Sequence, residues 1–134
     1  MTVFEEIAEP INARGERATY VNEKYGPHGR NTFDIWLAKS KQPTPLVIYI
    51  HGGGFTGGDK SRYFQSEDVV RFLESGVSVA TINYRFMNEA PYGILASMND
   101  SKRFVQFIRY HSAKYNIDKT RIACTGGSAG AGTA

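Results

Sequence analysis

Near the end of the chain, one serine stands at the centre of a glycine-rich turn, Gly126-Gly127-Ser128-Ala129-Gly130. An apolar segment precedes it, and this order is typical of a nucleophile elbow, where a strand turns sharply into a helix and lifts the central hydroxyl above the sheet edge. Only small neighbours tolerate such a turn, and the residues around the serine meet that condition. We therefore interpret Ser128 as a nucleophile, with free backbone N–H groups of the following helix available to an anion.

A second glycine-rich segment, His51-Gly52-Gly53-Gly54-Phe55, comes directly after the unbroken apolar run Leu46–Ile50. Consecutive glycines leave backbone N–H groups unshielded, which suits a loop that must closely approach a negatively charged oxygen. In acyl transfer the carbonyl oxygen becomes such an oxyanion, and losing one donor costs ~3 kcal/mol in the transition state. Because open α/β sheets bind ligands at the carboxyl ends of their strands, the two segments together predict one acyl-transfer site.

The elements that must position these segments alternate between strand and helix patterns. The expected order is a hairpin over residues 18–25 and 32–38, a buried strand over 46–50, a helix over 66–75, a buried strand over 77–82, a helix over roughly 94–115, a turn over 116–121 and the elbow strand. This alternation predicts an α/β fold with a mostly parallel sheet, an antiparallel N-terminal hairpin and helices on both faces. Residues 1–17 are polar and predict only a loosely docked or partly helical lead-in.

Composition limits the class of protein. The 134 residues are 41% hydrophobic and have room for one domain. The 16 basic and 13 acidic residues are scattered, which argues against a nucleic-acid partner. Cys124 is the single cysteine and predicts a small buried residue. The sequence shows no signal peptide and no apolar run of ~20 residues, so we expect a cytoplasmic protein with no membrane span.

Other glycine-loop functions fit less well. A phosphate loop over residues 53–61 would need lysine where Asp59 stands, and an acid there repels phosphate. A dinucleotide-binding turn over residues 126–132 is disfavoured by the upstream glycine run. Asp59, Arg85 and Asp100 are weighed as catalytic groups, but ion pairing or capping is the favoured reading for each. Tyr84, Phe86 and Phe55 are expected to pack, with an acyl pocket as the alternative.

Over about residues 18–134 the chain resembles the N-terminal half of an α/β-hydrolase of the HGGG esterase/lipase type, similar to carboxylesterases and hormone-sensitive-lipase-like enzymes. The matching segments are His51–Phe55, Asn83-Tyr84-Arg85, Asp100–Val105, Asn116-Ile117-Asp118 with Arg121-Ile122, and Gly126–Gly130. The resemblance implies that Ser128 is the nucleophile and that the backbone N–H groups of Gly53, Gly54 and Ala129 form the oxyanion hole. It also implies that His51 orders the loop, with Gly52, Gly126 and Gly130 supporting the site. An ester hydrolase of this type uses no metal or organic cofactor.

The chain departs from the family pattern after the serine. The triad of such enzymes runs Ser, then Asp or Glu, then His, yet residues 129–134 contain neither an acid nor a histidine. Upstream, His28, His51 and His111 are all poorly placed to act as base. We therefore expect the nucleophile and oxyanion hole without the triad acid and histidine, in a single α/β-hydrolase domain truncated after the elbow.

Three readings of function stay open. The first is hydrolysis of a small-molecule carboxylic ester through an acyl-enzyme. The second is amide hydrolysis, as in arylformamidase-like or prolyl-oligopeptidase-like enzymes, because elbow and oxyanion hole serve both leaving groups. The third is an inactive truncated fragment that binds a ligand or a partner chain. The elbow strand lacks an expected outer neighbour, so a second chain that completes the sheet is a further prediction.

Overall fold

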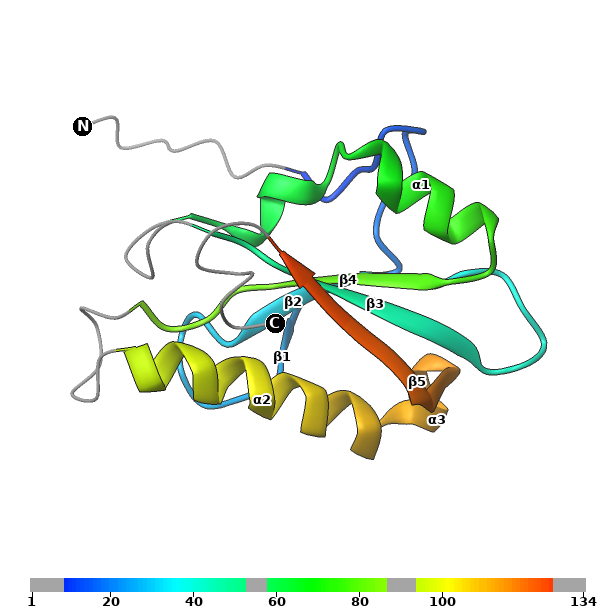
Figure 1. Cartoon of the computed structure of the whole chain (residues 1–134). Helices are drawn as coiled ribbons and strands as arrows, with labels where there is room; N and C mark the ends of the chain where they lie inside the picture. Colours follow the sequence, from blue (N-terminus) through cyan, green and yellow to red (C-terminus); the bar gives the residue numbers. More distant parts are fainter. Residues whose placement is uncertain (1–8, 53–57, 87–93, 127–134) are drawn as a thin grey trace.

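The computed structural model describes residues 9–52, 58–86 and 94–126 (Figure 1). Its elements are β1 (Tyr20–Lys24), β2 (Thr32–Trp36), β3 (Thr44–Ile50), η1 (Lys60–Tyr63), α1 (Glu67–Glu74), β4 (Ser78–Ile82), α2 (Ile94–Tyr110), α3 (Ser112–Tyr115) and β5 (Ile117–Gly126). The strands form one five-stranded sheet in the order β1-β2-β4-β3-β5. Figure 1 shows α1 on one face of this sheet and α2 with α3 on the other.

The sheet is mixed, as the strand patterns predict. The hairpin strands β1 and β2 pair antiparallel, and β2 also pairs antiparallel with β4. The other three strands are parallel, because β3 pairs with β4 on one side and with β5 on the other. All five residues of β4 are buried, as expected for a strand whose two faces are both covered.

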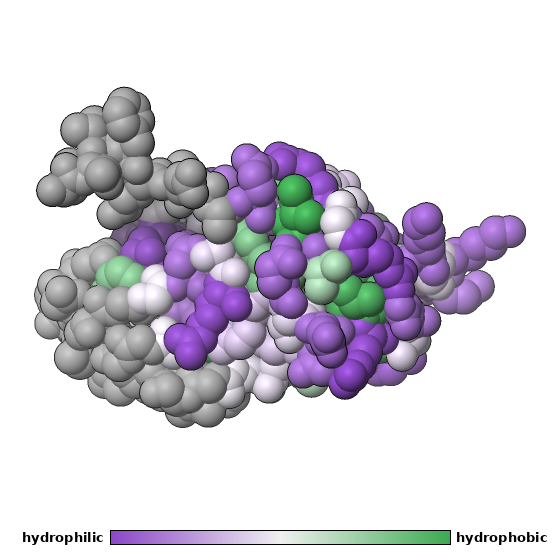
Figure 2. Space-filling view, turned by 90° about the horizontal axis from the view of Figure 1, so that it is seen from above, coloured by the Kyte–Doolittle hydropathy of each residue, from purple (hydrophilic) through white to green (hydrophobic). Residues whose placement is uncertain are grey.

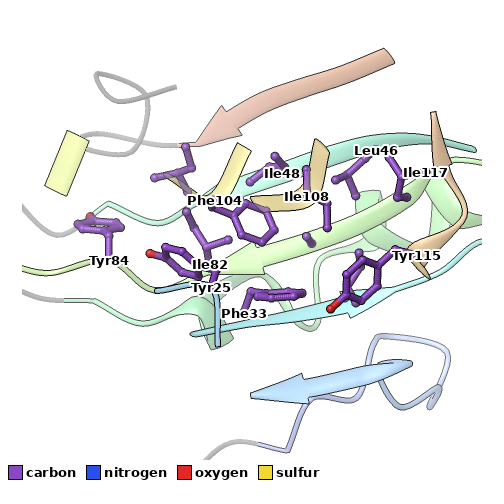
Figure 3. Close-up of a cluster of buried hydrophobic side chains, with 13 residues drawn as sticks. Tyr25, Phe33, Leu46, Ile48, Ile82, Tyr84, Phe104, Ile108, Tyr115 and Ile117 are labelled. Carbon is purple, nitrogen blue, oxygen red and sulfur yellow. The ribbon is translucent and has the colours of Figure 1, made fainter. Parts of the chain in front are cut away.

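Each face of the sheet has its own hydrophobic core. On the α2 face, Phe104 and Ile108 pack onto side chains from β2, β3 and β4 (Figure 3). On the α1 face, Val69 packs with Trp36 and Val79. Helix α1 starts where its sequence predicts, because the Ser66 side chain caps the helix by accepting a hydrogen bond from the Asp68 N–H.

The long helix expected over residues 94–115 is in fact two helices. Helix α2 ends at Tyr110, and α3 begins at Ser112 after an interruption at His111. Phe107 and Tyr115 still contact the same hydrophobic core on either side of this interruption. Because the apolar spacing continues across it, periodicity alone could not locate the break.

The turn expected over residues 116–121 lies mostly within β5. The first pairing of β5 joins Ile117 to Thr44 and the next joins Ile122 to Leu46, so the β5 side carries extra residues between the two pairings. Asp118 holds this irregular stretch by accepting hydrogen bonds from the Thr120 N–H at 2.9 Å and from its hydroxyl at 2.6 Å. These hydrogen bonds lower the pKa of Asp118 to about 2. The residues that predicted a turn do form turn-like hydrogen bonds, but they lie within a bulged strand.

The described part of the lead-in, residues 9–17, is a hydrogen-bonded loop with no helix. Ile11 and Arg17 form an isolated antiparallel bridge. The buried Asn12 accepts hydrogen bonds through Oδ1 from the N–H groups of Arg14 and Glu16, both at 3.0 Å. The indole N–H of Trp36 donates to the Glu16 carbonyl at 3.0 Å, so this loop is docked on the sheet.

Hydrophilic side chains cover most of the described surface on the α1 side, where hydrophobic areas are small and separate (Figure 2). Within the described ranges, none of the helices has the length and apolar character needed to span a bilayer.

Candidate active site at the carboxyl ends of the parallel strands

The register of the parallel strands brings the two glycine-rich segments together. Ile50, the last residue of β3, is paired with Ile82 of β4 on one side and with Gly126 of β5 on the other. Neighbouring strands lie roughly 4.8 Å apart, so the segment that begins at His51 leaves the sheet beside the start of the elbow. The predicted site residues Gly53, Gly54, Ser128, Ala129 and Gly130 lie outside the described residues, whereas His51, Gly52 and Gly126 lie at this edge of the sheet.

His51 is fully buried and both of its ring nitrogens have partners. Nδ1 lies 2.8 Å from the Gly52 carbonyl oxygen, and Nε2 lies 3.3 Å from a guanidinium nitrogen of Arg30. A carbonyl only accepts and a guanidinium only donates, so Nδ1 carries the proton and Nε2 is the acceptor. Burial lowers the pKa of His51, and the positive charge of Arg30 lowers it further. The ring is therefore neutral, and it has no nitrogen left to act as a base.

Tyr84 holds His51 from the side of β4. The two rings are stacked, with centroids 4.4 Å apart and an angle of 16° between their planes. The Tyr84 hydroxyl donates a hydrogen bond to the His51 carbonyl oxygen at 2.7 Å. Tyr84 is buried, so its expected packing role is confirmed.

Gly58 lies directly against the start of the same segment. Its φ angle is +93°, and a Cβ atom on it would clash with the Gly52 carbonyl oxygen and lie 2.6 Å from Nδ1 of His51. The two described ends of the segment, residues 51–52 and residue 58, are therefore in contact. The positive φ of Gly58 depends on this contact, and the sequence alone did not single the residue out.

Asp59 is a structural capping residue, as expected. Its side chain accepts a hydrogen bond from the Ser61 N–H at 2.9 Å, and this caps η1. It also accepts one from the Asn83 side chain at 3.0 Å, while Asn83 accepts from the Lys60 N–H at 2.7 Å. Burial alone would raise the pKa of Asp59, but the hydrogen bonds from Ser61 and Asn83 outweigh it and lower the pKa.

A buried ion pair fastens η1 to the sheet. Nζ of Lys60 lies 2.7 Å from Oδ2 of Asp34, and the two side chains are 9% and 0% exposed. The N–H of Asn22 donates to the other carboxylate oxygen of Asp34 at 2.7 Å. Sequence reasoning did not single out this pair, although an aspartate in the middle of an apolar strand was a signal that a partner should exist.

Asp100 is also fully engaged in structural contacts, and the structural role expected for it and for Arg85 is confirmed, because the two form an ion pair. The Arg85 side chain donates to both carboxylate oxygens at 3.0–3.2 Å, and its backbone N–H donates at 2.8 Å. Asn31 adds a hydrogen bond at 2.9 Å. The carboxylate of Asp100 therefore braces the segment after β4.

The other two histidines lie in two different connections of the fold. His28 lies in the turn between β1 and β2, where its backbone N–H donates to the Asn31 side chain at 3.1 Å. His111 immediately precedes α3, which leads into the first residue of β5, while the elbow follows the last residue of β5. Because Ile117 pairs with Thr44 and Gly126 pairs with Ile50, six residue steps of β3 separate these two points by roughly 20 Å.

The remaining groups to consider as functional are the single cysteine and any cluster of metal-binding side chains. Cys124 of β5 is half-buried against the α2-side core, where burial raises the pKa of its thiol. Among the described residues, no group of three or more His, Cys, Asp or Glu side chains is arranged to hold a metal ion.

Comparison with known proteins connects this geometry to a family. Residues 33–134 match the family model BD-FAE. The chain belongs to the BD-FAE family. It is 36% identical over 113 residues to the probable carboxylic ester hydrolase LipM of Mycobacterium tuberculosis, covering 79% of this chain and 25% of LipM. It is 34% identical over 112 residues to Esterase LipQ of the same organism, covering 80% of this chain and 26% of LipQ.

A solved structure extends the likeness of this BD-FAE chain to the fold. The structure titled "Truncated form of carbohydrate esterase from gut microbiota" has a TM-score of 0.71 and 28% identity, covering 83% of this chain and 39% of that one. The resemblance to HGGG-type esterases and the expected α/β-hydrolase fold are thereby confirmed. The BD-FAE chain spans about a quarter of the length of the two mycobacterial relatives.

Proposed function

We propose that the protein containing this chain hydrolyses carboxylic esters through an acyl-enzyme on Ser128. The observation that carries the proposal is the pairing of Ile50 with Gly126, because this pairing places the beginnings of the HGGG segment and of the elbow side by side. The names of LipM, LipQ and the carbohydrate esterase support ester cleavage over amide cleavage.

In the proposed reaction, Oγ of Ser128 attacks the ester carbonyl carbon while a base removes the hydroxyl proton. The carbonyl oxygen becomes an oxyanion that accepts hydrogen bonds from the N–H groups of Gly53, Gly54 and Ala129. The bond from the carbonyl carbon to the alcohol oxygen then breaks, and the alcohol leaves with the proton. Water attacks the acyl-enzyme in the second half, which releases the carboxylic acid and restores the serine.

The base and the acid of this mechanism are proposed to lie outside these 134 residues. His51 has both ring nitrogens engaged, and His111 lies at the other end of the sheet. The carboxylates of Asp34 and Asp100 are committed to Lys60 and Arg85. A serine without a base is a weak nucleophile, so we expect low or no turnover from the 134 residues alone.

The test measures hydrolysis of p-nitrophenyl acetate and butyrate by a longer protein that includes the residues beyond 134, and by the 134-residue chain. Replacement of Ser128 by alanine should lower kcat of the longer protein roughly 10⁴-fold or more. Ser75→Ala, at the exposed end of α1, is the matched control and should retain the rate. Equal rates for the unaltered protein and Ser128→Ala would contradict the proposal.

Two additional measurements separate the rival readings. Cleavage of p-nitroanilides at a rate comparable with the esters would favour amide hydrolysis. A fluorophosphonate probe should form a covalent adduct on Ser128, located by mass spectrometry. A longer protein that binds esters without turnover and forms no adduct would favour the non-catalytic reading.

A further inference from the structure

Arg30 contacts residues on both sides of the HGGG loop and residues just after β4, although it comes from the turn between β1 and β2. Its Nε donates to the Tyr84 carbonyl oxygen at 2.8 Å, just after β4. One terminal nitrogen lies 3.3 Å from Nε2 of His51 and 3.1 Å from the Gly58 carbonyl oxygen. The guanidinium carbon lies 3.7 Å from the ring centroid of Phe86, which gives a cation–π contact. A single planar side chain thus bridges His51 and Gly58, which lie on either side of segment 53–57.

The chemistry of these partners selects a guanidinium. His51 Nε2 and the carbonyl oxygens of Gly58 and Tyr84 are all acceptors, and the planar fork of arginine presents donors in fixed, separate directions. A lysine ammonium is one charged centre on a flexible stem, and it stacks less well on an aromatic ring. Lysine at position 30 would keep the charge but could not hold all three acceptors and Phe86 at the same time.

We propose, on the basis of the proposed ester hydrolysis, that Arg30 is a positioning residue of the oxyanion-binding segment. Its guanidinium holds His51 and Gly58 together and keeps His51 as an uncharged acceptor, and these two residues flank the segment that the proposed mechanism uses. Arg30 acts through these residues and contacts no reacting atom.

This role predicts an effect on kcat more than on KM. Donors aimed at a developing oxyanion stabilise the transition state far more than the bound substrate, and a displacement of about 1 Å can cost ~10²-fold in rate. Arg30→Met should therefore lower kcat about 10- to 100-fold at nearly unchanged KM. The kcat of Arg30→Lys should lie between those of the unaltered protein and Arg30→Met. Added methylguanidinium should restore part of the kcat of a variant with a smaller side chain, Arg30→Ala.

A second measurement follows the contact directly and needs no activity. The chain has three histidines, so ¹H–¹⁵N correlation spectra of histidine-labelled protein can resolve each ring. His51 should show a protonated Nδ1 and a bare Nε2. The charged groups that act on its ring are Arg30, Arg62 and Asp59, and the ring also stacks on Tyr84. Removing the Arg30 charge in Arg30→Met should raise the pKa of His51, whereas Arg71→Met, which changes an exposed side chain of α1, should leave that pKa unchanged.

Each outcome decides the proposal. A lower kcat at constant KM and unchanged melting temperature, rescue by methylguanidinium and the raised histidine pKa would together support it. A loss of activity that only follows the fraction of unfolded protein would overturn it, as would a protonated Nε2 on His51. If the unaltered protein and Ser128→Ala are equally inactive, the proposed function fails, and the ring spectra then decide separately whether Arg30 holds His51.

Discussion

His51 lies between an aromatic ring and a guanidinium, and this environment determines its charge. Stacking on Tyr84 removes the ring from water, and Arg30 places a positive charge beside Nε2. Both effects disfavour the imidazolium ion, so the pKa of His51 is lower than its ordinary value. The residue that most resembles a catalytic base in this region therefore serves as a neutral hydrogen-bonding bridge.

The stability of the protein should consequently fall in mild acid because of His51. A histidine with a lowered folded-state pKa binds fewer protons in the native state than in the unfolded chain, where its pKa is ~6.5. The contribution of neutral His51 to the free energy of unfolding is therefore complete above about pH 6.5, and it is lost as the pH falls from there towards the folded-state pKa. Urea unfolding at a series of pH values, for the unaltered protein and His51→Asn, measures this.

The difference between the two free energies of unfolding should shrink as the pH is lowered below about 6.5. Asparagine is a suitable replacement because its amide can still donate to the Gly52 carbonyl while it does not titrate. Parallel curves for the two proteins would show that His51 does not contribute to the acid dependence.

Gly58 should be the glycine least tolerant of substitution among those described. An alanine there meets both an unfavourable positive φ and a clash with Gly52, and the two effects together should cost about 3 kcal/mol. Gly15→Ala is the control for strain alone, since its φ is +81° with open space around it. Gly29→Ala has neither problem. Chemical denaturation should rank the losses Gly58, Gly15, Gly29, and a Gly58 loss no larger than that of Gly15 would contradict the close contact.

At the scale of the elements, the Lys60–Asp34 ion pair joins η1 to β2 and so fixes the position of η1 on the sheet. Because the pair is buried, removing one partner leaves an unpaired charge in a low-dielectric site. Lys60→Met should destabilise the protein by about 3–5 kcal/mol. Thermal and urea unfolding provide the measurement.

The double variant Asp34→Asn with Lys60→Met tests that explanation. It removes the charge and retains an acceptor for the Asn22 N–H, so it should be more stable than Lys60→Met alone. Arg71→Met is the control, because its ion pairs on α1 are exposed and longer, at 3.5 and 3.6 Å, and should contribute under about 1 kcal/mol. If the double variant were less stable than Lys60→Met, the loss of stability would come from packing and not from the unpaired charge.

Element prediction succeeded where local signals were complete. The Ser66 cap and the acidic first turn of α1 both lie in one short segment, and that helix was predicted within a residue at each end. The break at His111 was missed because the apolar residues on both sides pack against one core. The beginning of β5 was missed because Asp118 forms a turn-like hydrogen bond inside a paired strand.

At the scale of the whole molecule, the strand order makes stability uneven across the sheet. β4 lies between β2 and β3 and is wholly buried, whereas β1 and β5 are the edges of the described sheet. On β5, exposed residues alternate with partly buried ones from Arg121 to Gly126. The centre should therefore open least often, and the edges should open locally.

Native-state hydrogen exchange should reproduce this order. Amides of residues 79–82 should exchange most slowly, and alternate amides of β5 that point away from β3 should exchange fastest. Recording the exchange at several protein concentrations also tests the predicted second chain. Protection of the outer β5 amides that increases with concentration would show that another chain pairs with this edge, and fast exchange at every concentration would speak against it.

The sequence by itself determined the strands, most of the helices and the two glycine-rich segments, because side-chain period, caps and glycine runs are local properties. It also predicted that both segments lie at carboxyl ends of parallel strands, a placement that the pairing of Ile50 with Gly126 agrees with. Only the tertiary structure showed that Arg30 reaches His51 and that Asp34 is paired with Lys60. Those contacts depend on the order β1-β2-β4-β3-β5, which brings a hairpin turn beside the ends of β3 and β4, and no local pattern encodes that order.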